Sequence, residues 1–196
     1  MARRPTLHLA GLPPTLRLAS MVGLAIVGLA TSAATDAVSR ASAAPTEAEG
    51  GPGALRIGET APPMRAERIV GSDEVSLPRL GGRVVVLDFW ATWCRPCRAI
   101  MPVLDQLNRR LHDRGLTVIG VSRERRPTIE AHLQRAPVTY TVARDVGGTQ
   151  LQYGISALPT LVIIDRRGRV REVRVGGDHI ETLGPLLERL LAEPAP

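Results

Sequence analysis

Apolar and polar positions along this chain alternate between continuous apolar runs and helical spacing. Residues 83–90 and 116–121 form nearly continuous apolar runs, which are typical of strands buried on both faces. Between them, apolar residues recur every three or four positions and predict a helix over residues 95–114, which Gly115 terminates. The residues that set this spacing are Ile100, Val103, Leu104, Leu107 and Leu111. The pattern therefore predicts a strand–helix–strand unit in the middle of the chain.

The segment before the central strand predicts a hairpin. Residues 64–70 and 74–77 have the composition of strands and flank the turn formers Gly71, Ser72 and Asp73. A proline follows the second of these strands, and it closes the strand because it cannot donate to a ladder of hydrogen bonds. We therefore expect two short strands that pair with each other ahead of the main sheet.

The second half of the chain supplies the remaining elements. A helix is expected over residues 127–135, with a proline in its first turn. Asp178 and Glu181 are spaced as a capping box and predict a last helix from about residue 178, interrupted at Gly184-Pro185. The other expected elements are a short strand at 140–142, a helical turn at 149–153, and strands at 161–164 and 170–175 joined by a hairpin turn. This order predicts an α/β fold with a mixed sheet covered on both faces.

The two cysteines of the chain lie at the junction between the central strand and the helix that follows it. Cys94 and Cys97 are three residues apart, so they share one face of the first helical turn and their sulfurs can meet. Unpaired N–H groups and the helix dipole favour a thiolate at this position. A static disulfide or half of a zinc site would use the same pair, although a thiolate zinc site needs more cysteines than the chain has.

The residues around this pair carry a family resemblance. Trp93-Cys94-Arg95-Pro96-Cys97 matches the W-C-x-P-C motif of the thioredoxin superfamily, and Asp88-Phe89-Trp90-Ala91 matches the segment leading into it. Three further segments resemble that superfamily in the expected order: residues 58–62, similar to the start of the domain in the exported TlpA/ResA-like branch, residues 157–160, similar to the cis-proline loop, and residues 164–169, similar to the following hairpin. The resemblance implies a thioredoxin fold over residues 56–193, that is, a mixed central β-sheet flanked by helices, with the first hairpin as an N-terminal β-hairpin extension.

The resemblance also implies roles for individual residues. Cys94 is the expected nucleophile, and Cys97 the residue that resolves the mixed disulfide. Asp88 interrupts an apolar run, and burial there would raise the pKa of its carboxyl enough for proton exchange with Cys97. Many TlpA/ResA-like proteins carry another residue at this point, and an aspartate that only reaches solvent at the strand end is the alternative.

Five further residues are expected to support the cysteines. By the resemblance, the Leu158–Pro159 peptide bond is cis, and the backbone near Leu158 pairs with an extended substrate. Trp93 covers the disulfide or contacts partners, and a packing role fits equally well. Arg95 tunes the potential or the choice of partner, or is a solvated surface charge. Pro96, beside the second cysteine, resembles reducing members of the superfamily.

The N-terminal segment has the layout of an export signal. Arginines precede an apolar stretch from residue 18 to about residue 30, and Ala41-Ser42-Ala43 offers a cleavage site. The apolar stretch is about 13 residues, shorter than the roughly 20 of a membrane span, although small residues extend it to residue 37. Residues 1–43 are therefore a signal peptide or a membrane anchor through residues 18–37, and residues 44–55 a flexible linker. Both interpretations place the domain outside the cytoplasm.

Composition excludes some functions. The net charge is +6, and all 25 basic residues are arginine. These arginines are interspersed with acidic residues and lack aromatic platforms, which argues against nucleic-acid binding. The four histidines, His8, His112, His132 and His179, show no metal-like spacing and are expected on the surface, apart from His8 in the export signal. We expect no cofactor and no metal.

The leading interpretation is an exported thiol:disulfide oxidoreductase, a reductase of envelope protein disulfides with a possible part in cytochrome c maturation. Its partners would be protein thiol or disulfide clients and a membrane electron donor, in the periplasm or at the inner membrane. A thiol peroxidase is one alternative, but Ala91 stands where that chemistry needs a threonine or serine, and Leu87 where it needs a proline. A copper metallochaperone is another, but it uses a C-x-x-x-C spacing, one residue longer than the spacing here.

Overall fold

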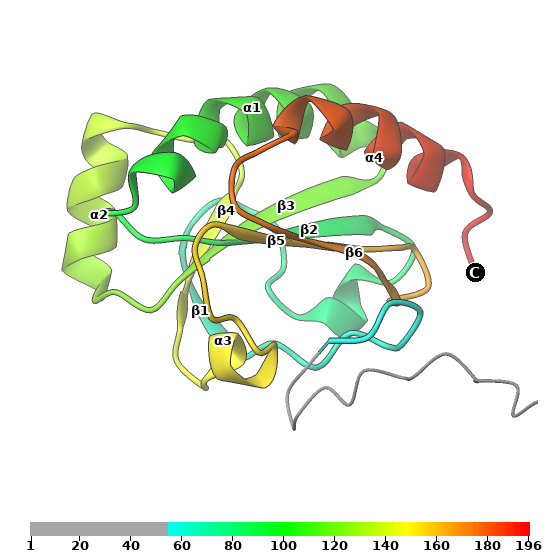
Figure 1. The fold of residues 1–196 in the computed structure, drawn as a ribbon, viewed down its shortest axis with the longest axis horizontal. Coiled ribbons are helices and arrows are strands. Elements are labelled where there is room, and N and C mark those ends of the chain that lie inside the picture. The colour runs from blue at the N-terminus through cyan, green and yellow to red at the C-terminus, as the bar shows by residue number, and fades with distance from the viewer. Residues whose placement is uncertain (1–54) are drawn as a thin grey trace, which may run out of the picture. The chain divides into compact units, whose positions relative to one another are not determined.

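Residues 55–196 are described in a computed structural model and form one six-stranded mixed sheet with helices on both faces (Figure 1). The strand order is β1-β4-β3-β2-β5-β6. The strands are β1 (Ala66–Val70), β2 (Val84–Phe89), β3 (Leu116–Ser122), β4 (Thr141–Asp145), β5 (Thr160–Ile164) and β6 (Val170–Val175). The helices are α1 (Arg95–Leu111), α2 (Arg126–Arg135), α3 (Thr149–Gln152) and α4 (Leu183–Ala192), with short 3-10 turns η1 (Leu77–Leu80), η2 (His112–Arg114) and η3 (Ile180–Thr182).

Strand β2 lies at the centre of this sheet. It pairs in parallel with β3 and antiparallel with β5. Strands β3 and β4 are also parallel, whereas β1 and β6 pair antiparallel at the two edges. The expected mixed central sheet and thioredoxin fold are therefore confirmed.

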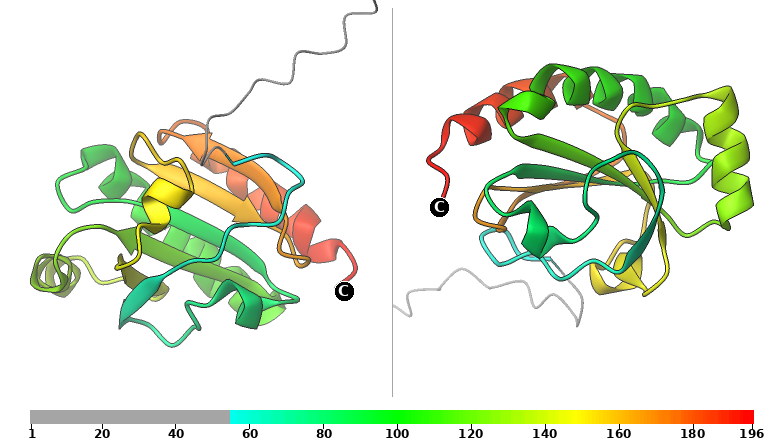
Figure 2. Two further views of the ribbon diagram at one scale, coloured as in Figure 1. Left: turned by 90° about the horizontal axis from the view of Figure 1, so that it is seen from below. Right: turned by 180° about the vertical axis from the view of Figure 1, so that it is seen from behind.

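Two apolar layers enclose the sheet. Val84, Val86 and Trp90 face the layer formed with α1, α2 and α4, and Leu87 and Phe89 face the layer on the side of α3 and η1. Figures 1 and 2 show α1 and α4 lying together over the first face, with α3 on the opposite one. Because side chains of a strand alternate between faces, a strand covered on both sides must be apolar throughout. This explains the continuous run in β2, all of whose residues are buried.

The expected N-terminal hairpin is wrong in its second strand. Strand β1 forms as expected but pairs with β4, and residues 74–76 belong to no strand. The Glu74 carboxylate accepts the N–H groups of Val75 and Ser76 at 2.9 and 3.2 Å, so these donors are satisfied locally. The Asp73 N–H donates to Thr141 Oγ1 at 3.0 Å, which fastens the turn to β4.

The start of the last helix also differs from expectation. Asp178 and Glu181 form no capping box, because α4 begins at Leu183 after the 3-10 turn η3, and His179 adopts a left-handed conformation with φ 58°. Gly184-Pro185 falls within the first turn of α4. The N–H groups of this turn have no acceptor inside the helix, so a proline, which lacks the N–H, costs no intrahelical hydrogen bond. The pair therefore starts the helix and does not interrupt it.

The central helix agrees with its prediction. Helix α1 ends in the 3-10 turn η2, and Gly115 closes that turn in the left-handed conformation with φ 103°. Within residues 55–196, the helices are too short or too polar to cross a bilayer. The proposed signal or anchor over residues 1–43, and nearly all of the proposed linker, lie outside the described residues.

Candidate functional site

Cys94 and Cys97 are joined in a disulfide at the start of α1. Their sulfurs are 1.99 Å apart and their Cα atoms 5.3 Å, so the expected meeting of the two side chains is confirmed. Cys94 caps the helix, and its sulfur accepts the Cys97 N–H at 3.2 Å. Cys94 is 4% exposed and Cys97 fully buried. The outer sulfur at the helix N-terminus is the one whose thiolate the dipole and the N–H groups stabilise.

The loop before Cys94 is held by two charged side chains. The Glu124 carboxylate accepts the Thr92 N–H at 2.6 Å and the Thr92 hydroxyl at 2.7 Å. From the other side, the Arg98 guanidinium donates to the Thr92 carbonyl at 2.6 Å. Hydrogen bonds to charged groups are the strong ones in proteins. Three hydrogen bonds from two charged side chains therefore fix Thr92, two residues before the reactive sulfur.

Asp88 is buried in β2, the strand that leads into this loop. Its side chain has no exposed surface, and neither carboxylate oxygen has a hydrogen-bond partner within the described residues. Desolvation raises the pKa of this carboxyl from 3.8 to about 7. The alternative that Asp88 reaches solvent at the strand end is therefore wrong.

Gly120 makes room for the large side chains around Asp88. It lies directly opposite Asp88 in the neighbouring strand β3. A Cβ atom at this position would lie 3.0 Å from Trp90 Nε1 and 3.4 Å from the Tyr140 ring. The indole N–H and the Tyr140 hydroxyl are buried and have no partner among residues 55–196. A glycine here thus lets two aromatic side chains pack beside an ionisable carboxyl.

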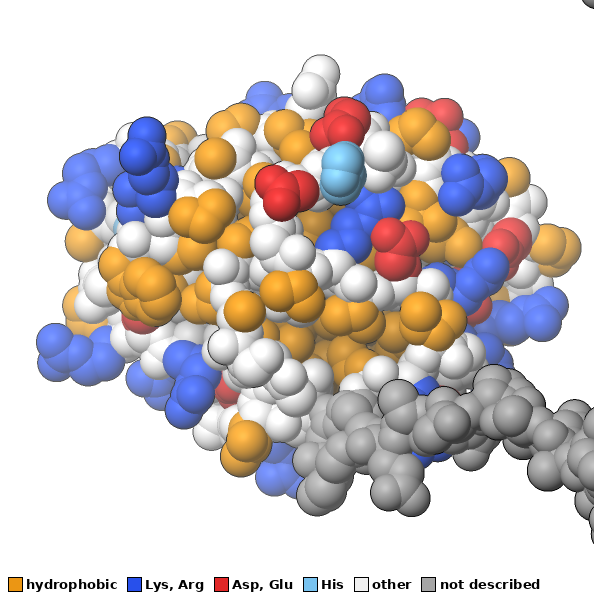
Figure 3. All heavy atoms as spheres, viewed as in Figure 1, with side chains coloured by type: hydrophobic (Ala, Val, Ile, Leu, Met, Phe, Trp, Pro, Cys, Tyr) orange, Lys and Arg blue, Asp and Glu red, His pale blue; other side chains and the backbone are white. Residues whose placement is uncertain are grey.

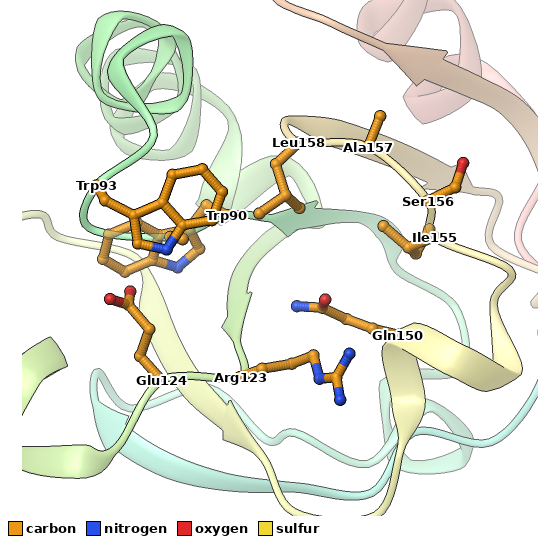
Figure 4. Close-up of a pocket in the computed structure, with 10 residues that line it drawn as sticks. Trp90, Trp93, Arg123, Glu124, Gln150, Ile155, Ser156, Ala157 and Leu158 are labelled. Carbon is orange, nitrogen blue, oxygen red and sulfur yellow. The ribbon is translucent and has the colours of Figure 1, made fainter.

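The cis-proline loop lies across a groove from the cysteine motif. The Leu158–Pro159 peptide bond is cis, as expected from the resemblance. A groove of about 520 Å³ runs between the Trp90–Trp93 segment and this loop, and Figure 4 shows the Leu158 side chain facing Trp93 across it. Trp93 is 72% exposed, so it does not pack in the core. The structure therefore brings the sequence-predicted residues of the motif and the loop to one edge of the sheet.

Arg95 and Pro96 lie on the surface in the first turn of α1. Arg95 makes no ion pair within residues 55–196, unlike Arg109 later in the same helix, which pairs with Asp105 at 2.8 Å. Pro96 is at a position where the helix needs no N–H donor. Both residues leave the surface beside the disulfide open to a partner.

The positions of two residues in this region differ from, or are absent from, the expectations drawn from the sequence. Glu124 was not singled out, because nothing in its loop signals a contact with Thr92. His132 was expected on a helix surface, but it is only 9% exposed and its ring lies 5.4 Å from the Trp90 ring, centroid to centroid. Burial and nearby arginines lower its pKa. Its position three residues after the buried Ile129 places it on the inward face of α2, and that spacing could have revealed it.

No three histidine, cysteine, aspartate or glutamate side chains gather as a metal site in the part of the chain that the structure describes. The chemistry that the geometry offers is carried by the two sulfurs and the buried carboxyl.

Fold and site together define a thioredoxin-fold protein with a disulfide between two cysteines, three residues apart, at a helix N-terminus. The chain belongs to the AhpC/TSA family, which matches residues 57–173. It is 30% identical to "Thioredoxin-like protein YneN" of Bacillus subtilis over 62% of this chain and 73% of that protein. It is 29% identical to "Thiol-disulfide oxidoreductase ResA" of Geobacillus thermodenitrificans over 67% of this chain and 80% of that protein.

A solved structure agrees with these relatives. The crystal structure of a protein described as thiol:disulfide interchange protein DsbE, from Chlorobium tepidum, superposes with a TM-score of 0.63 and 33% sequence identity. The match covers 70% of this chain and 99% of that chain. The resemblance to the TlpA/ResA-like branch of the thioredoxin superfamily is thereby confirmed.

Proposed function

We propose that this protein is an extracytoplasmic thiol:disulfide oxidoreductase that reduces disulfides of envelope proteins through Cys94 and Cys97. The observation that carries the proposal is the disulfide at the N-terminus of α1, beside an open groove. A purely structural disulfide would have no need of the groove or of an exposed tryptophan next to it. The similarity to proteins named thiol-disulfide oxidoreductase and thiol:disulfide interchange protein supports the same activity.

The proposed reaction passes two electrons from the dithiol to the client. The Cys94 thiolate attacks one sulfur of the client disulfide, so a mixed disulfide forms and the other client sulfur leaves as a thiolate. The Cys97 thiolate then attacks the Cys94 sulfur, which releases the second client thiolate and closes the Cys94–Cys97 bond. The two client thiolates take up the two protons that the dithiol gives up. A membrane-bound dithiol protein restores the reduced form by the reverse exchange.

Asp88 is the group that we assign to the proton of Cys97. Cys97 is fully buried and has to lose its proton before it can attack. A carboxyl whose pKa is about 7 is partly ionised at neutral pH, so it can accept this proton and later return it. Both groups lie on the α1 side of the sheet, since Asp88 alternates with Leu87 and Phe89, which face the other layer.

The remaining site residues are assigned to client binding. The backbone at Leu158, held by the Pro159 carbonyl accepting the Gly176 N–H at 2.8 Å, is available to pair with an extended client segment. Trp93 offers an exposed apolar surface beside the disulfide. Arg95 and Pro96 form the variable centre of the motif, where they tune the potential and the choice of partner.

We infer the cellular setting from the layout of the N-terminal sequence. We place residues 56–193 outside the cytoplasm, secreted or anchored to the inner membrane through residues 18–37. Envelope proteins with misformed disulfides are suitable clients, and so are the cysteines to which haem is attached during cytochrome c maturation. The partner that supplies electrons is a thiol reductase in the membrane.

Peroxide reduction deserves a direct comparison because the AhpC/TSA family is broad. That chemistry needs a hydroxyl side chain three residues before the reactive cysteine, and Ala91 at that position is buried and apolar. We therefore expect the purified protein to consume no hydrogen peroxide beyond the rate of a free thiol.

Client trapping tests the proposed function. The variant Cys97→Ala, produced in the envelope, is expected to accumulate mixed disulfides on Cys94 that mass spectrometry identifies. Equilibration with glutathione gives the potential, which we expect in the reducing half of the range from about −270 to about −120 mV. A dithiol that reduces no small disulfide and traps no protein would refute the proposal.

A further inference from the structure

One arginine lines the groove beside the disulfide. Arg123 and Glu124 are the charged residues that line it, and both come from the loop between β3 and α2. The Glu124 carboxylate is already occupied by Thr92, as described above, and by the Ser122 hydroxyl at 3.3 Å. Arg123 is exposed and makes no ion pair with any carboxylate of residues 55–196. Figure 4 shows its side chain extended along the groove towards Gln150.

Of the other 20 arginines among residues 55–196, seven form ion pairs with carboxylates. Arg126 and Arg144 both bind Glu67, at 2.7 and 3.3 Å, and Arg171 binds Glu193 at 2.6 Å. Those arginines therefore have their charge balanced within the fold. Arg123 is distinguished by its place in the lining of the groove, where the carboxylate of the next residue, Glu124, is held by other donors.

Further exposed arginines lie in the first turn of α1 and directly before α2. Arg95, Arg98 and Arg125 are exposed, and no ion pair balances them within residues 55–196. Figure 3 shows blue arginine side chains with little red beside them on the side of the molecule where α2 lies and α1 begins, whereas the acidic side chains gather mainly on the side of α4. A cationic surface of this kind attracts acidic partners and raises their association rate.

The rest of the groove fits an extended peptide. Trp93, Ile155 and Leu158 supply apolar surface on its two sides, and the polar side chain of Gln150, only 6% exposed, lines it as well. An arginine fork and a glutamine amide are both donors that bind a carboxylate. The apolar sides accommodate side chains next to the client cysteine while the arginine binds an acidic one.

We infer that this groove selects client segments that carry an aspartate or glutamate close to the disulfide cysteine, with Arg123 as the specificity-determining residue. This inference rests on the proposed function, because it names the substrate class of that same site. The client carboxylate binds the Arg123 guanidinium, and Gln150 donates a second hydrogen bond. The client cysteine then lies at Cys94, where the exchange described above takes place. Arg123 acts on binding and takes no part in the transfer of electrons.

Matched peptides test the inference. The substrates are three disulfide-linked peptides that differ at one position, which lies two residues before or two residues after the cysteine. The residue there is glutamate in the first peptide, glutamine in the second and arginine in the third. With the full reduced protein, we expect kcat/KM to be about 3- to 10-fold higher for glutamate than for glutamine, as one partly exposed charge-assisted contact allows. The preference should decrease in 0.5 M salt because the contact is screened.

Variants separate the inference from the proposed function. Arg123→Gln should reduce the glutamate-to-glutamine ratio to about one, Arg123→Lys should retain part of it, and Arg123→Glu should favour the arginine peptide. Arg189→Gln removes an exposed arginine of α4 and should leave the ratio unchanged. Equal rates for all peptides with the parent protein, or a ratio that survives Arg123→Gln, would overturn the inference. If no peptide is reduced at all, the proposed function itself fails.

Discussion

Replacing Asp88 with asparagine should change how the stability of the protein depends on pH. The folded state raises the pKa of this carboxyl from 3.8 to about 7, so it binds the proton more tightly than the unfolded chain does. The resulting stabilisation is fully present below about pH 4 and is lost as the pH rises through 7. The difference between these two pKa values corresponds to about 4 kcal/mol of unfolding free energy, since a tenfold change in proton affinity is worth about 1.36 kcal/mol. Because Asp88 is fully buried, no reduction for solvent screening applies.

The asparagine variant lacks this dependence and keeps the shape of the side chain. We therefore expect the unfolding free energy of Asp88→Asn, minus that of the parent, to grow by about 4 kcal/mol from pH 4 to pH 8. Urea denaturation of both oxidised proteins at several pH values, followed by tryptophan fluorescence, measures this difference. All other titrating groups are common to the two proteins, so their contributions cancel. A difference that stays constant across this pH range would show that the carboxyl is not desolvated in the folded state.

The same variant tests the proton transfer separately. If Asp88 takes the proton of Cys97, Asp88→Asn should slow the second step of the exchange, in which the mixed disulfide is resolved. General base catalysis contributes about 10²- to 10⁴-fold in favourable cases, so a reduction of at least 10-fold near pH 7 is expected. Rapid mixing with a peptide disulfide and acid quenching reports the lifetime of the mixed disulfide. An unchanged lifetime from pH 6 to pH 8 would refute the assignment even if the stability result holds.

Three further variants probe the site. Cys97→Ser should prolong the mixed disulfide on Cys94 by several orders of magnitude, which non-reducing gels resolve. Glu124→Ala should lower the unfolding free energy by about 2 kcal/mol in urea denaturation, since the partly buried donors of Thr92 lose a charged acceptor. Gly120→Ala should lower it by about 1–3 kcal/mol, because the added methyl group meets an indole nitrogen at 3.0 Å.

Each variant has a matched control. Cys94→Ser combined with Cys97→Ser should form no mixed disulfide at all. Glu130→Ala removes a surface carboxylate paired with an arginine at 3.0 Å, and should change stability by less than about 1 kcal/mol. Gly81→Ala places its methyl group 3.6 Å from the nearest atom and should change stability by about 0.5 kcal/mol or less. Equal losses in a variant and its control would contradict the contact assigned to the variant.

The sequence was sufficient for the parts of the site that are local in the chain. Cys94 and Cys97 are one helical turn apart, and the apolar run before them predicts a buried strand. These features depend on neighbours within a few residues, so spacing alone predicts them. The cis bond before Pro159 is predicted only through the family resemblance. The position of its loop beside the motif depends on how β5 pairs with β2, which local spacing does not reveal.

Contacts between distant segments account for the predictions that were wrong or incomplete. The prediction of a hairpin was wrong because β1 pairs with β4, about 75 residues later. The Glu74 carboxylate accepts the backbone N–H groups of the expected second strand, so these groups need no partner in a sheet. Glu124 has no periodicity or motif that marks it, and its role follows from Thr92, 32 residues earlier in the chain. A strand pairing or a loop contact of this length leaves no trace in local spacing.

The environment of Asp88 depends both on local sequence and on a contact between distant segments. The sequence shows a carboxyl inside an apolar run. This pattern is consistent with a buried acid and also with an aspartate that reaches solvent at the end of the strand. The structure decides between them, because Asp88 is fully buried, and the register of β2 with β3 places Gly120 opposite it and leaves room there for Trp90 and Tyr140. A larger residue at 120 would displace those rings and admit water, which would return the pKa of Asp88 towards its ordinary value. The acid–base property proposed for Asp88 therefore depends on a glycine 32 residues away as much as on the aspartate itself.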